Sequence, residues 1–151
     1  MADDSEFTPQ QEAEKYIRRA RMKAREIEAK LLETGGTYDA LIYDSYNAMF
    51  MAARAALHVM EKQCNSHRTV ASNYKHEIVE KKLIDPKFAD HLHKIQVYWE
   101  EEQAGTKHEI DAERAQRIFV ATRDIVDALA VVAGVKAADT KMAQARQLYN
   151  G

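Results

Sequence analysis

The chain has 151 residues, of which 46% are hydrophobic and 30% charged, and this balance indicates a folded globular protein. Its formal net charge of −2 argues against the strong basic excess of domains that bind nucleic acid with their whole surface, and we expect no DNA partner. The single cysteine excludes an intramolecular disulfide, and no apolar run approaches the roughly 20 residues of a membrane span, so we expect a cytoplasmic protein without membrane contact.

The amino-terminal part predicts a long helix. Residues 1–7 are acidic and polar, and we expect a disordered tail. Thr8 follows as a helix cap, with Pro9 at the first helical position and Gln11 closing a capping box. Apolar residues then recur every three or four positions, at Ala13, Ile17, Ala20, Ala24, Ile27 and Leu31. This spacing predicts about six helical turns, which Gly35 and Gly36 end.

The opposite side of this first helix is basic. It carries Arg18, Arg19, Arg21, Lys23 and Arg25. Such a face is either solvated and paired with glutamates, or a surface for RNA or an acidic partner.

The stretch 38–62 predicts the central helix of the fold. Its apolar residues lie at Ile42, Tyr46, Met49, Phe50, Ala53, Leu57 and Met60, the stripe of an amphipathic helix. Many small residues accompany this stripe, which lets neighbouring helices approach closely. Ser45 and Asn47 lie among the apolar positions, and a buried polar group needs a partner. Asn47 fits equally a groove or a satisfied amide in the core.

Three further helices are expected after the central one. Ser66 caps a third that runs towards Leu83, and Asp85 caps a fourth with Pro86 in its first turn. Residues 100–111 are expected to form a loop, and a fifth helix extends from there to Gly134. The sequence thus predicts an all-α, antiparallel bundle of about five helices over residues 8–134, followed by a tail or short helix over 135–151.

The sequence contains few candidates for catalytic chemistry. No histidine follows a glutamate by three positions and no Cys-x-x-Cys pair exists, so we expect neither a metal site nor a cofactor. A Gly-x-Ser-x-Gly turn and a phosphate-binding glycine loop are also lacking. Asp44 borders the small-residue stripe. Its simpler interpretation is an exposed residue with a structural role. His67 and Arg68 are either a surface pair or groove residues that hold a phosphate at a helix start.

The segment 45–57, SYNAMFMAARAAL, resembles the signature helix of the HEPN domain family. Ser66-His67-Arg68 is similar to the step that opens the next helix in many members, and the segment 83–86 resembles their link into the fourth helix. The resemblance covers residues 38–129. It implies four or five helices, usually in a dimer, with a polar groove at the partner face. Such domains are often encoded beside minimal nucleotidyltransferases.

Many members of that family are metal-independent ribonucleases, often toxins, with four to six residues between an arginine and a following histidine. In such a site the histidine transfers protons and the arginine steadies the phosphate. No arginine of this chain has that spacing, and Arg54 and His58 come nearest with three residues between them. We therefore expect the resemblance to hold for the fold, and we assign no catalytic residue.

Our leading hypothesis is a non-catalytic interaction module that dimerises or binds a partner protein, such as a nucleotidyltransferase or a larger enzyme. The alternatives are a nucleotide- or RNA-binding subunit and an unconventional metal-independent ribonuclease. The candidate ligand- or partner-binding residues are Asp44, Asn47, Arg54, His67, Arg68 and Tyr98.

Overall fold

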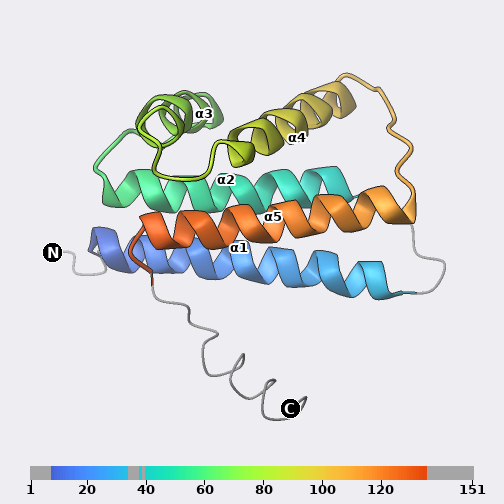
Figure 1. Cartoon of the computed structure of the whole chain (residues 1–151), viewed down its shortest axis with the longest axis horizontal. Coiled ribbons are helices and arrows are strands. Elements are labelled where there is room, and N and C mark those ends of the chain that lie inside the picture. Colours follow the sequence, from blue (N-terminus) through green and yellow to red (C-terminus); the bar gives the residue numbers. More distant parts are fainter. Residues whose placement is uncertain (1–7, 34–37, 39, 136–151) are drawn as a thin grey trace, which may run out of the picture.

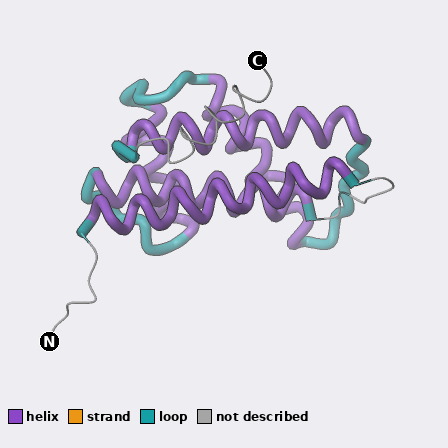
Figure 2. Tube along the Cα trace, turned by 90° about the horizontal axis from the view of Figure 1, so that it is seen from below, coloured by secondary structure: helices purple, strands orange, loops and turns teal. Residues whose placement is uncertain are grey.

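The computed structural model describes residues 8–33, 38 and 40–135 (Figure 1). These residues form five α-helices and one π-helix, η1, which continues α3. The elements are α1 (Pro9–Leu32), α2 (Leu41–Val59), α3 (His67–Asn73), η1 (Tyr74–Val79), α4 (Lys87–Gln103) and α5 (Ala112–Val132). No strand occurs in the described residues (Figure 2), and the expected all-α bundle is confirmed.

Helix α2 lies at the centre of the bundle. It contacts α1, α5, α4, α3 and η1, so every other described element packs against it. Helices α1, α2 and α5 run side by side, and α3 and α4 lie over the opposite side of α2 (Figure 1). Helix α1 is antiparallel to α2, whereas α5 runs in the same direction as α2 (Figure 1).

Small residues allow this close packing. The alanines of α2 at positions 48, 52, 53, 55 and 56 are fully buried. Without a long side chain they admit α1 and α5 close to the α2 backbone, and Ile17, Ile27, Ile125 and Leu129 fill the remaining space. The apolar stripe expected of the first helix is the buried face of α1, apart from Leu31, which is half-buried.

The helix ends follow local capping chemistry. Thr8 and Gln11 form the expected capping box, in which the Gln11 amide donates to Thr8 Oγ1 at 3.1 Å. Ser66 caps α3, and Asp111 caps α5 by accepting from the Arg114 amide at 2.7 Å. Gly134 ends the fifth helix with a positive φ of 68°. These four termini match the sequence predictions.

Several helix boundaries differ from expectation. The central helix ends at Val59, because Glu61 adopts a left-handed φ of 58° and the Lys62 amide donates to the Leu57 carbonyl at 2.9 Å. Helix α4 begins one residue after Pro86 and extends through Gln103, so residues 100–103 are helical and not a loop. Beyond α3 the third helix continues only as the π-helix to Val79.

Several expectations concern residues outside the described ranges. These are the tail at residues 1–7, the glycines at 35 and 36, and the segment 136–151. Within the described part, no helix is long and apolar enough to cross a membrane.

Candidate functional site

One face of α2 is only partly covered by the rest of the chain. Tyr43 is 51% exposed, and the other residues of this face are half-buried, whereas the remainder of α2 up to Leu57 is buried. The face consists of Tyr43, Asn47, Phe50, Met51, Arg54 and His58. Because they are three or four positions apart along the helix, these side chains form a continuous row, here called the open stripe.

Helix α1 borders the carboxyl-terminal end of the open stripe, at Arg54 and His58. The Arg54 guanidinium lies 4.9 Å from the centre of the Tyr16 ring of α1, and the His58 ring meets the same tyrosine edge-on at 6.4 Å. Arg54 Nε is buried and has no hydrogen-bond partner among the described residues. Cys64 Sγ lies 3.9 Å from His58 Nδ1. Arginine, histidine and tyrosine from two helices thus meet at one place.

An aromatic cluster borders the stripe on its other side. His67, at the start of α3, is hydrogen-bonded through Nδ1 to the Tyr46 hydroxyl at 3.0 Å and stacks on Phe50 at 4.1 Å. The Tyr46 ring also stacks on Trp99 of α4 at 4.7 Å. Burial, and then the nearby Glu100 carboxylate, raises the pKa of Tyr46. His67 therefore joins three helices, α2, α3 and α4, in one contact.

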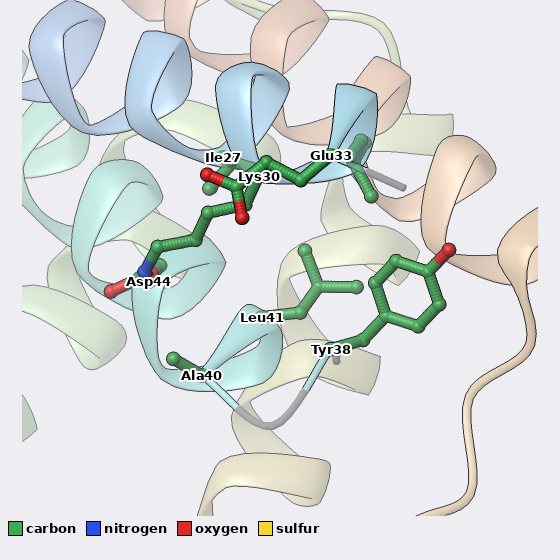
Figure 3. A pocket seen from close by; sticks show the side chains of 8 residues that line it. Ile27, Lys30, Glu33, Tyr38, Ala40, Leu41 and Asp44 are labelled. Carbon is green, nitrogen blue, oxygen red and sulfur yellow. The ribbon is translucent and has the colours of Figure 1, made fainter. Parts of the chain in front are cut away.

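Asp44 differs from its expected exposure. It is 5% exposed, and its carboxylate accepts from Lys30 Nζ at 3.1 Å and lies 3.7 Å from Lys23 Nζ. Burial is tolerated because two lysines of α1 compensate the charge. Lys30 and Asp44 form one wall of a pocket of about 280 Å³ between α1 and α2, where the lysine side chain reaches across to the carboxylate (Figure 3).

Asn47 belongs to the open stripe and not to the core. Its Nδ2 donates to the Tyr43 carbonyl one turn earlier at 2.9 Å, so the amide turns back on its own helix. Ser45 is completely buried, and its hydroxyl has no hydrogen-bond partner in the part of the chain that the structure describes. Of Ser45 and Asn47, only Asn47 is both hydrogen-bonded and accessible.

The two remaining candidates, Arg68 and Tyr98, have no hydrogen bond, ion pair or ring contact with the open stripe. Arg68 is exposed and has no hydrogen bond or ion pair with any described residue. Tyr98 is hydrogen-bonded to Arg114 of α5, and its ring packs against that of His108 at 4.6 Å. Its contacts therefore join α4 to α5 and to the loop between them. The six candidates do not converge on a single centre.

Sequence reasoning missed Tyr16, Tyr46 and Trp99 as neighbours of the candidate residues. Tyr46 belongs to the apolar stripe predicted for the central helix, and nothing local pairs a residue of α2 with one of α4 more than fifty positions away. The one available signal was the aromatic character of these two positions. No group of three or more histidine, cysteine or acidic side chains in the described ranges is arranged to hold a metal ion.

The protein is thus a small all-α domain, a helical bundle whose central helix is partly uncovered. The family model of the HEPN domain matches residues 13–132, from the first core alanine of α1 to the last residue of α5. The chain belongs to the HEPN domain family. A comparison with curated proteins finds no match.

Proposed function

We propose that this chain is a non-catalytic interaction module whose open stripe is covered by another protein chain, either a second copy or a partner such as a nucleotidyltransferase or a larger enzyme. One observation carries the proposal. The helix that contacts every other described element still leaves a row of aromatic, methionine and arginine side chains partly uncovered. Those residue types are enriched where proteins meet.

The polar groups of the stripe also favour a binding role. Arg54 lies against Tyr16, and Asn47 is hydrogen-bonded to its own helix, so both side chains are held in place before any partner arrives. Contact groups with restricted side-chain freedom lose little conformational entropy on association. Tyr43 adds a large, half-exposed ring near one end of the row.

A negative charge introduced into the open stripe tests the proposal. Tyr43→Glu should abolish association, because a carboxylate would be desolvated in the interface, and should leave folding intact, because Tyr43 is half-exposed. Molar mass by light scattering, together with identification of any stoichiometric partner that co-purifies, measures this. Val131→Glu, at a 78% exposed apolar residue of α5, is the matched control. A monomeric wild-type chain without a partner, or association unchanged in Tyr43→Glu, would contradict the proposal.

A second candidate function is metal-independent RNA cleavage, favoured by the meeting of Arg54 and His58 at Tyr16. In that role His58 would transfer a proton and Arg54 would stabilise the charge that develops on the phosphate. RNA cleavage by the purified chain that is lost in His58→Ala and kept in His93→Ala would establish it. Cleavage that survives His58→Ala would assign the activity to other residues or to a contaminant.

A further inference from the structure

Positive charge is concentrated in the middle of α1. Between Glu14 and Glu26 the chain has six basic residues and no acidic one, although its overall net charge is −2. The basic residues are Lys15, Arg18, Arg19, Arg21, Lys23 and Arg25. Over a helical rise of about 18 Å, α1 therefore presents a local charge opposite in sign to that of the whole chain.

Three arginines of this block have no partner within the described part of the chain. Arg18, Arg19 and Arg21 make no hydrogen bond or ion pair there, whereas Lys23 pairs with Glu26 at 3.4 Å and lies near Asp44. The expected solvated face with glutamate partners is thus realised at Lys23 and not at these arginines. Arginines three positions apart on a helix repel each other, and this repulsion favours an external anionic partner.

An exposed methionine lies among these arginines. Met22 is 52% exposed, so its apolar side chain is accessible to another chain. Arg18 and Arg19 precede it by four and three positions, so they are its neighbours on the helix surface. We call Arg18, Arg19, Arg21 and Met22 the basic face.

We propose that the basic face binds an acidic segment of a partner protein, with an apolar side chain of that segment placed against Met22. The proposal rests on the proposed function and names the chemistry of the partner. Arg19 lies one turn from both Tyr16 and Lys23, which contact Arg54 and Asp44 of α2. The basic face therefore adjoins the border of the open stripe, and one partner can reach both surfaces.

The composition of the basic face favours a protein segment over RNA. Arginine and methionine are enriched in protein interfaces, whereas single-stranded nucleic acid is bound by cations together with exposed aromatic rings. Tyr16, the aromatic residue of α1, lies outside the basic face, and its half-buried ring already contacts the Arg54 guanidinium and the His58 ring. Glu14 and Glu26 bound the block at both ends and would repel a phosphate backbone that continues along the helix.

Fluorescence anisotropy with labelled probes tests the inference. The probes are a glutamate-rich peptide that contains leucines, polyglutamate of the same length, and a polyuridine RNA of similar charge. We expect the leucine-containing peptide to bind most tightly, and its affinity to fall between about 10 mM and about 150 mM ionic strength. Arg18→Glu/Arg21→Glu should weaken it at least about tenfold. Met22→Ser should weaken this peptide but not polyglutamate.

The matched control is Lys94→Glu/Lys107→Glu, which makes the same change in net charge at exposed residues outside α1. Equal loss of peptide binding in both double variants would show a non-specific charge effect and overturn the inference. Tighter binding of the RNA than of either peptide would also overturn it, and would assign the surface to nucleic acid. If Tyr43→Glu abolishes association while the α1 variants change nothing, the inference fails and the proposed function stands.

Discussion

Among single residues, Asp44 combines burial with charge. Among the described residues, its carboxylate is compensated only from α1, by Lys23 and Lys30, whose side chains are 28% and 51% exposed. The two lysines can be solvated without Asp44, but the buried carboxylate depends on the lysines. The ion pair is thus asymmetric, and the two partners should respond differently to removal.

Asp44→Ala should lower the free energy of unfolding by about 1 to 3 kcal/mol, because it removes a buried hydrogen-bonded carboxylate from the contact between α1 and α2. The matched Lys30→Ala should cost less than about 1 kcal/mol, since Lys30 is half-exposed and Lys23 remains beside the carboxylate. Denaturant unfolding of both variants measures the difference. A larger cost for Lys30→Ala would refute this account.

His91 on α4 links stability to pH. Burial lowers its pKa below the ordinary value of 6.5, and the nearby Lys94 ammonium lowers it further. As the pH falls below 6.5, the unfolded chain takes up this proton before the folded chain does, so the free energy of unfolding decreases. His91→Gln should make the pH profile flatter below 6.5. His93→Gln, at an exposed position on the same helix, is the matched control, and identical profiles for His91→Gln and wild type would contradict the assignment.

At the scale of the elements, the backbone conformation at the end of α2 is energetically unfavourable for the residue that adopts it. Glu61 occupies the left-handed position after the helix, where a side chain is unfavourable and glycine is preferred. Glu61→Gly should therefore raise the free energy of unfolding by up to about 1 kcal/mol. Glu28→Gly, in the middle of α1, is the opposite control and should lower it by about 1 kcal/mol. Thermal unfolding compares them; a destabilised Glu61→Gly would show that the glutamate side chain has a stabilising role.

At the scale of the whole molecule, sequence reasoning succeeded where structure depends on neighbouring residues. The caps at Thr8 and Ser66 involve groups three positions apart, and the buried face of α1 follows from helical spacing. The burial of Asp44 could not be predicted in this way, because its compensating lysines come from another helix.

The π-helix and the neighbours of His67 were also beyond local rules. The hydrogen bonds of a π-helix span five residues and those of an α-helix span four, and a segment of six residues is too short for this difference to appear in the spacing of its apolar residues. The contact of His67 with Tyr46 and Trp99 requires three helices to be placed before any of the rings meet. Candidate residues could therefore be named from the sequence, but their grouping could not.

The hydrogen bond from Gln10 Nε2 to the Gly134 carbonyl, 3.1 Å long, joins the first turn of α1 to the end of α5. The start of α1 and the end of α5 thus lie next to each other. Such proximity is required of a domain that can be inserted into a loop of another protein. A short linker could join them, and the chain could be reopened at the turn around Gly105, between α4 and α5, without cutting a helix. The same bundle is therefore compatible with a circularly permuted order of its helices.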